Sequence, residues 1–191
     1  MSEETAPGEE LLTRALAGET TAFAALVRAQ QRSVYSLALR MLCDRQKAED
    51  LAQEVFLQLH RNLAAIESVT HLAFWLRKVT VNRAIDRLRR EPKMAVLPLE
   101  AADTVPEDGL NEDHLDDDPL LVRRLRQLVE QLPPAPRAVL LLRYQEDLDP
   151  TDIARTLSMS INTVKSHLKR SLATLRKGID VAAAQAVRSR T

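Results

Sequence analysis

Apolar residues recur every three or four positions along most of the chain, and no segment alternates apolar and polar residues as a half-buried strand does. In the first half this spacing predicts four helices, over 9–17, from Thr20 or Thr21 onward, over 45–63 and over about 70–90. Gly18 would end the first, Thr20 or Thr21 would cap the second, Asp44 would cap the third and Pro92 would stop the fourth. The pattern is that of an all-α protein.

The second half predicts another set of helices. One begins at Asp118 or Pro119 and runs to Gln131, where a cluster of prolines breaks it, and the next runs from Pro136 to Tyr144. A final helix is expected to end at Lys177, with Gly178 as its C-cap and an Ala-rich, frayed helical tail after it.

The segment Asp149–Arg170 reads as two short helices joined by a tight turn. Asp149 and Ser160 are suited to cap the two helices, and Pro150 suits the first helical position. Ser158 stands at a turn position where a positive φ would favour glycine. This is the helix-turn-helix pattern, whose second helix enters the DNA major groove. Its expected inward residues are Ile153, Ala154, Leu157, Val164 and Leu168, and its expected outer residues are Thr163, Lys165, Ser166, Lys169 and Arg170.

Charge is strongly segregated, although the 27 basic and 27 acidic side chains cancel. The charged residues within 72–94 are mostly basic, residues 95–120 carry no Lys or Arg, and basic residues again outnumber acidic ones from Leu121 onward. This order predicts two small polyanion-binding helical domains, residues 8–93 and 119–178, with an acidic flexible linker at 94–118 and a tail at 179–191. The linker contains Pro98, Pro106 and Gly109.

Other classes of function lack support. The single Cys43 is expected to be a small buried apolar residue, and no Cys/His set has zinc spacing. No nucleophile–base set or Gly-rich phosphate loop indicates an enzyme, so no catalytic residue, metal, cofactor or small-molecule substrate is expected. No apolar run approaches a membrane span and the acidic N-terminus is unlike a signal peptide, so we expect a cytoplasmic protein without direct membrane insertion.

Two helices carry polar faces that leave alternatives open. Acidic and amide side chains follow one side of the stripe in AEDLAQEVFLQL (48–59), either as a solvated face or as a docking face for a partner. In FWLRKVTVNRAIDRLRRE (74–91), Trp75 is expected in the core, and several Asn and Arg residues share one side at helical spacing. Such side chains read base edges or hold phosphates.

These parts occur in a recognisable order: AEDLAQEVFLQL, FWLRKVTVNRAIDRLRR, an acidic linker, and LPPAPRAVLLLRYQEDLDPTDIARTLSMSINTVKSHLKRSLATLR. The chain resembles the extracytoplasmic-function (ECF) sigma factors of bacterial RNA polymerase over roughly 23–90 and 122–177. The resemblance implies a promoter-specific initiation factor, with a region 2-like first domain that docks on core polymerase and melts the −10 element. It implies a region 4-like second domain that reads the −35 element.

The resemblance also implies roles for individual residues. Core polymerase docking corresponds to Glu49, Asp50, Gln53 and Glu54. The loop that accepts an unstacked −10 base corresponds to 67–72, and the helix beside the non-template strand to Lys78, Asn82, Arg83, Asp86 and Arg87. The −35 element would contact Thr163, Lys165, Ser166, Lys169 and Arg170. The implied partners are core RNA polymerase, promoter DNA and an anti-sigma factor.

Two questions stay open at this stage. A stand-alone regulator with a response-regulator type of helix-turn-helix is the main alternative, although residues 8–93 show neither a phosphoacceptor α/β pattern nor a ligand pocket signature. The acidic linker could equally be an RNA-like occupant of the polymerase channel or a simple soluble connector. A further hypothesis is that the linker folds back on the basic helices and inhibits their binding to DNA.

Overall fold

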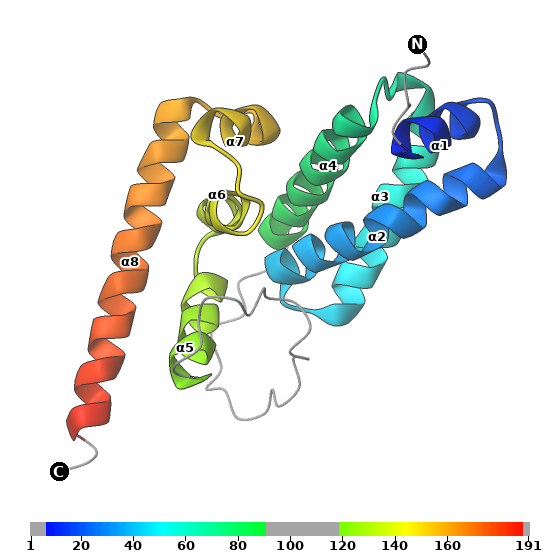
Figure 1. Ribbon diagram of the computed structural model, residues 1–191. Helices are drawn as coiled ribbons and strands as arrows, with labels where there is room; N and C mark the ends of the chain where they lie inside the picture. Colours follow the sequence, from blue (N-terminus) through cyan, green and yellow to red (C-terminus); the bar gives the residue numbers. More distant parts are fainter. Residues whose placement is uncertain (1–6, 91–118, 189–191) are drawn as a thin grey trace. The chain divides into compact units, whose positions relative to one another are not determined.

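The computed structural model describes residues 7–90 and 119–188, and all regular structure within these ranges is helical (Figure 1). The all-α prediction is confirmed for this part of the chain. The helices fall into two compact units. The N-terminal unit contains α1–α3 and most of α4, and the C-terminal unit contains α5, α6, α8 and the first part of α7. The predicted linker 94–118 and the predicted stop at Pro92 lie outside the described residues.

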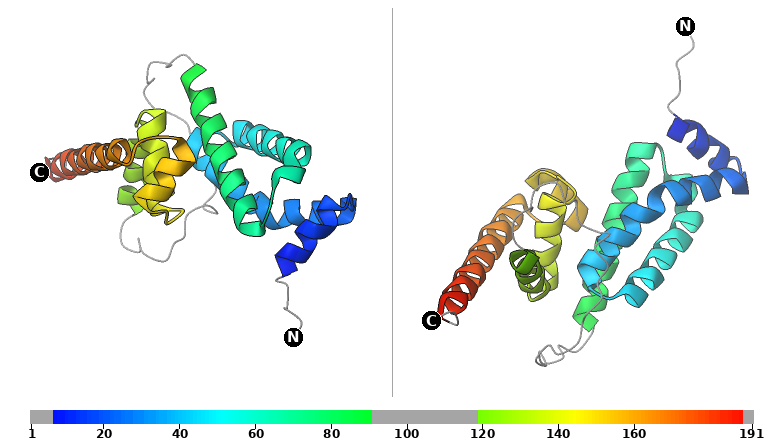
Figure 2. Two further views of the ribbon diagram at one scale, coloured as in Figure 1. Left: turned by 90° about the horizontal axis from the view of Figure 1, so that it is seen from above. Right: turned by 60° about the horizontal axis from the view of Figure 1, so that its bottom comes forward.

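The N-terminal unit is built from α1 (Pro7–Leu16), α2 (Thr20–Leu42), α3 (Arg45–Asn62), the 3₁₀ turn η1 (Leu63–Ala65) and α4 (Val69–Arg90). The long helix α2 packs against α1, α3 and α4 (Figures 1 and 2). The predicted stripe of α3 is buried at Leu51, Ala52, Val55 and Leu59, while Phe56 and Leu63 are half-buried.

The prediction that Trp75 of α4 lies in the core is wrong. Trp75 is only half-buried, whereas Leu72, Leu76, Val81, Ala84 and Ile85 form the core face. Thr80 is fully buried as well, and its hydroxyl donates to Leu76 O at 2.7 Å. This hydrogen bond satisfies the polar atom and allows Thr80 to occupy an apolar position.

The caps of α2 and α3 follow the sequence only in part. Asp44 caps α3 as predicted, its Oδ1 accepting a hydrogen bond from Lys47 N–H at 3.0 Å. The prediction of Thr20 or Thr21 as the cap of α2 is wrong, because Glu19 is the N-cap residue there. Cys43 is exposed rather than buried, since it ends α2 in a left-handed conformation with φ 55°.

The C-terminal unit brings α5 (Pro119–Glu130) and α6 (Pro134–Tyr144) against the long helix α8 (Ile161–Arg188) (Figure 1). Its core includes Leu128, Leu132, Leu140 and Leu175, and the half-buried Ile179 packs against them. The predicted end of α8 at Gly178 is therefore wrong: the helix continues because Ile179 packs in this cluster. Gly178 faces Leu128 so closely that an added Cβ would lie 2.5 Å from Leu128 Cδ2.

No helix within the described ranges is both long enough and apolar enough to cross a membrane.

Candidate functional site

The connection between α7 (Pro150–Leu157) and α8 has the geometry of a helix-turn-helix. Asp149 caps α7, its Oδ1 accepting from Thr151 N–H at 2.7 Å and from Asp152 N–H at 2.9 Å. Ser160 caps α8, its Oγ accepting from Thr163 N–H at 3.1 Å. Ser158 in the turn has φ 52°, so the strain expected at this non-glycine position is present.

The two faces of the start of α8 differ as predicted. Val164 is fully buried and Leu168 half-buried, and Ile153, Ala154 and Leu157 are buried on α7. The opposite face of α8 is exposed at all five candidate DNA-binding residues: Thr163, Lys165, Ser166, Lys169 and Arg170. A helix that exposes its polar and basic side chains while its apolar side is buried has the form of a groove-reading element.

The candidate docking face on α3 is fully available at its surface. Glu49, Asp50, Gln53 and Glu54 are all exposed. Asp50 accepts a hydrogen bond from Gln46 Nε2 at 3.4 Å on the same helix. Glu54 instead forms an ion pair with Arg83 Nη1 of α4 at 3.3 Å. The four residues thus share one helix, but only Glu54 is tied by this ion pair to the neighbouring helix.

The candidate −10 residues on α4 are held in different ways. Arg83 also donates from Nε to Gln58 Oε1 of α3 at 2.8 Å, so its guanidinium is directed toward α3. Lys78 is half-buried, with Nζ 5.9 Å from the centre of the Phe74 ring. Asn82 and Arg87 are half-buried, and Asp86 is exposed. The set therefore does not form one free face: Arg83 is engaged within the unit.

The candidate base-accepting loop is shorter than expected. Only Ile66, Glu67 and Ser68 lie between η1 and α4, and residues 69–72 already form the first turn of α4. Glu67 is exposed, whereas Ile66 is 2% exposed and Leu72 is fully buried. The connection is thus a tight, anchored turn.

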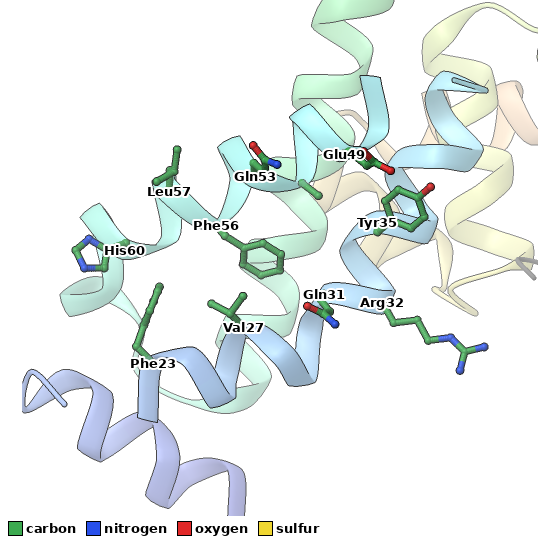
Figure 3. Close-up of a pocket in the computed structure, with 11 residues that line it drawn as sticks. Phe23, Val27, Gln31, Arg32, Tyr35, Glu49, Gln53, Phe56, Leu57 and His60 are labelled. Atoms are coloured by element: carbon green, nitrogen blue, oxygen red, sulfur yellow. The ribbon is translucent and has the colours of Figure 1, made fainter. Parts of the chain in front are cut away.

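An apolar groove between α2 and α3 was not recognised in the sequence (Figure 3). It encloses about 940 Å³, and Phe23 and Val27 of α2 point toward Phe56 of α3. Phe23 meets His60 edge to face, with ring centres 5.1 Å apart. Leu57 on its rim is 60% exposed, and the candidate docking residues Glu49 and Gln53 also line the groove. Each helix contributes residues that look like ordinary stripe positions, so neither sequence segment reveals the groove alone.

Within residues 7–90 and 119–188 no group of three or more His, Cys, Asp or Glu side chains is arranged to hold a metal ion. The candidate surfaces consist of exposed polar, basic and apolar side chains.

Comparison with known families matches both units. A model of Sigma-70 region 2 matches residues 26–93, and a model of Sigma-70, region 4 matches residues 122–175. The ECF RNA polymerase sigma factor SigK of Mycolicibacterium vanbaalenii is 31% identical over 186 residues, covering 93% of this chain and 92% of SigK. The chain belongs to the family of ECF RNA polymerase sigma factors. It is an alternative sigma factor that binds core RNA polymerase and directs promoter-specific transcription initiation.

Other relatives agree with this assignment. The ECF sigma factor SigW of Bacillus subtilis is 29% identical over 168 residues, covering 84% of this chain and 90% of SigW. Two solved structures share the fold. CnrH, in complex with the cytosolic domain of CnrY, has a TM-score of 0.64 at 18% identity, covering 91% of this chain and 97% of CnrH. RpoE of Bartonella quintana, in complex with the anti-sigma factor NepR, has a TM-score of 0.62 at 17% identity, covering 83% and 97%.

Proposed function

We propose that the two units of this ECF sigma factor divide promoter recognition between them. In this proposal α8 reads the −35 element with Thr163, Lys165, Ser166, Lys169 and Arg170. The observation that carries the proposal is the contrast along α8, where all five residues are exposed while the intervening Val164 is fully buried. Lys and Arg can bind phosphates or the guanine edge, and Ser and Thr can contact either base edges or phosphates.

The N-terminal unit is proposed to dock on core polymerase and to open the −10 element. The exposed carboxylates and amide on α3, Glu49, Asp50, Gln53 and Glu54, supply the polar part of the docking face. The groove that Glu49 and Gln53 border adds an apolar part, as the buried core of a protein interface requires. Lys78, Asn82, Arg83, Asp86 and Arg87 of α4 are assigned to the −10 region, with Arg83 acting after release from Glu54 or by orienting α3.

We further propose regulation by a protein partner of the anti-sigma class, and action in the cytoplasm with the polymerase. Such a partner would compete with polymerase for Asp50 and the adjoining groove, and would cover the recognition helix. The same exposed surfaces that serve initiation are available to it.

A set of variants tests the division of roles. The promoter is first selected from genomic fragments by run-off transcription with the wild-type holoenzyme. Lys165→Ala and Arg170→Ala should weaken holoenzyme binding to this promoter by about 1–3 kcal/mol if the side chains contact bases. Asn82→Ala should leave duplex binding intact and slow strand opening, measured by permanganate reactivity.

Lys177→Ala is the matched control, because Lys177 is exposed on the same helix but outside the candidate set. Its promoter affinity should stay close to that of the wild type. If Lys165→Ala and Asn82→Ala gave the same defect in binding and opening, the proposed division between the units would be wrong.

A further inference from the structure

Glu9 of α1 reaches the start of α4, sixty residues further along the chain. Its Oε1 accepts a hydrogen bond from Val69 N–H, the first amide of α4, at 2.9 Å. The first four N–H groups of a helix have no partner inside the helix, and a carboxylate there also meets the positive end of the helix dipole. Glu9 therefore caps the first amide of α4 from a helix that is distant in the sequence.

The rest of the turn before α4 is held by local contacts. Ser68 Oγ accepts from His71 N–H at 3.0 Å, and Ser68 O accepts from Leu72 N–H at 2.8 Å. His71 Nδ1 accepts from Glu67 N–H at 3.3 Å. These bonds fix residues 67–72 relative to one another. The Glu9 bond is different, because it fixes the turn relative to α1.

Helix α1 is itself firmly seated. Leu12 and Ala15 are buried, at 2% and 4% exposure. Gly8 lies against Val69, where an added Cβ would be 3.2 Å from Val69 Cγ2. The N-terminal end of α1 thus approaches Val69 in two ways: Gly8 lies against the Val69 side chain, and Glu9 accepts the hydrogen bond of the Val69 amide. Figure 1 shows α1 beside the connection from α3 to α4.

We propose that Glu9 is a positioning residue for promoter opening, acting through Val69 to hold the turn at 66–69 in the shape that accepts an unstacked −10 base. The inference rests on the proposed −10 opening by this unit and on the base-accepting role that the family resemblance implies for residues 67–72. A turn that is held in its binding shape loses less conformational freedom when the base arrives. Unstacking a base costs a few kcal/mol of free energy, which binding of the base to the turn must offset. A loosened turn binds the base more weakly and therefore offsets less of this free energy.

Three variants separate the geometry of Glu9 from its charge. Glu9→Ala removes the acceptor, and Glu9→Asp keeps the charge but withdraws the carboxylate by one methylene. Glu9→Gln loses the charge but keeps the length and a carbonyl oxygen in the position of Oε1. Glu10→Ala is the matched control, because Glu10 is exposed on the same turn and its contact is Arg14, at 3.9 Å.

The readout is the discrimination of each holoenzyme between two fork-junction promoter DNAs, one intact and one with an abasic site at an unpaired −10 position. The position is the one at which wild-type holoenzyme discriminates most in an abasic scan. Discrimination by Glu9→Ala and Glu9→Asp should fall by up to about tenfold, as expected for the loss of a hydrogen bond. Glu9→Gln and Glu10→Ala should stay within about twofold of the wild type. Affinity for core polymerase should not change in any variant.

Each contrary result has a separate meaning. If the wild type discriminates and Glu9→Ala and Glu9→Asp match Glu10→Ala, the role of Glu9 is overturned while the proposed function stands. A Glu9→Gln defect as large as that of Glu9→Ala, or a parallel loss of core affinity, also overturns it. If Glu9→Ala does not fold, the comparison of Glu9→Asp with Glu9→Gln decides. If the wild type discriminates at no −10 position, the base-accepting assignment and this inference both fail.

Discussion

Arg83 and Glu54 form an ion pair between α4 and α3, with Nη1 3.3 Å from Oε2. The family resemblance implies different tasks for these residues, the −10 strand for Arg83 and core polymerase for Glu54. In the structure they contact each other, and Arg83 also donates to Gln58 at 2.8 Å. A change at Glu54 consequently alters the surroundings of Arg83 as well, whereas Asp50 accepts a hydrogen bond from Gln46 on its own helix.

This pairing makes Asp50→Lys a cleaner test of core docking than Glu54→Lys. Asp50→Lys should leave the free energy of unfolding within about 0.5 kcal/mol of the wild type, as for most surface changes. Glu54→Lys places a second cation beside Arg83 and should lower the free energy of unfolding by up to about 1 kcal/mol more than Asp50→Lys does. Both should lower core affinity, measured by fluorescence polarisation, and stability is measured by urea unfolding. Unchanged core affinity in Asp50→Lys would refute the docking assignment.

The strength of the pair itself can be measured by a double-mutant cycle of Glu54→Ala and Arg83→Ala. The side chains are 48% and 44% exposed, so we expect a coupling energy of only about 0.2–1 kcal/mol in the free protein. Such a weak pair can open when polymerase or DNA competes for either partner. A cycle of Asp50→Ala with Arg83→Ala serves as the control and should show coupling near zero. A coupling well above this range would indicate that Arg83 is locked to α3.

The features that the sequence predicts well are those fixed by a few neighbouring residues. Asp44, Asp149 and Ser160 cap their helices as expected, because a cap depends on a side chain and an amide two or three positions apart. Ser158 stands at the turn position where a positive φ would favour glycine, and its φ is positive in the structure. The five outward residues of the recognition helix followed from helical spacing alone.

The features that the sequence missed depend on contacts between distant segments. Gly178 looks like a C-cap, but packing of Ile179 against α5 carries the helix past it. Phe23 and Phe56 each fit an apolar stripe, and their shared groove arises only when α2 and α3 come together. Arg83 has helical spacing with other candidate −10 residues, yet its partners come from α3. Periodicity shows which side of a helix a residue occupies, not which neighbour it meets.

An ion pair at the connection from α1 to α2 should make the stability of the fold depend on pH. Arg14 donates to Glu19 through Nε at 2.7 Å and through Nη2 at 2.6 Å, and Thr21 donates to the same carboxylate. These hydrogen bonds lower the pKa of Glu19 from 4.5 to about 2, and the bond from Arg14 has the largest effect, followed by that from Thr21. Because the folded pKa lies below the unfolded one, the ionised carboxylate stabilises the fold above about pH 4.5, and this stabilisation is lost as the pH falls through about 2.

Carboxylate NMR would measure this directly. Glu19 should still be mostly ionised at a pH of about 3 in the wild type, where ordinary glutamates are largely protonated. In Arg14→Ala the pKa of Glu19 should rise toward its ordinary value, and in Thr21→Ala it should rise by less. An unchanged titration of Glu19 in Arg14→Ala would show that the pair does not persist in solution.

The strained turn of the helix-turn-helix predicts a stabilising substitution. Ser158 has φ 52°, a conformation that costs L-residues roughly 1–2 kcal/mol but not glycine. Ser158→Gly should therefore raise the free energy of unfolding by about 0.5–1 kcal/mol, after allowing for the greater entropy of glycine in the unfolded chain. Ala173→Gly, at an exposed position inside α8, should instead lower it by about 1 kcal/mol. Urea unfolding measures both, and a destabilised Ser158→Gly would contradict the strain.

Ser160 links the stability of the recognition helix to its use. Its Oγ accepts from Thr163 N–H and lies 2.8 Å from Thr163 Oγ1, so it orients a candidate −35 residue while it caps α8. Ser160→Ala should lower the free energy of unfolding by about 1 kcal/mol and also weaken −35 binding, because the first turn frays. Ser160→Thr should restore both properties.

Ser160→Asp should restore stability, since Asp is a good cap, but not binding, because its carboxylate would repel nearby phosphates. Urea unfolding and promoter binding at two salt concentrations separate the two effects. Full promoter affinity in Ser160→Asp at low salt would place Ser160 away from the DNA backbone and would remove this face of α8 from the proposed −35 contact.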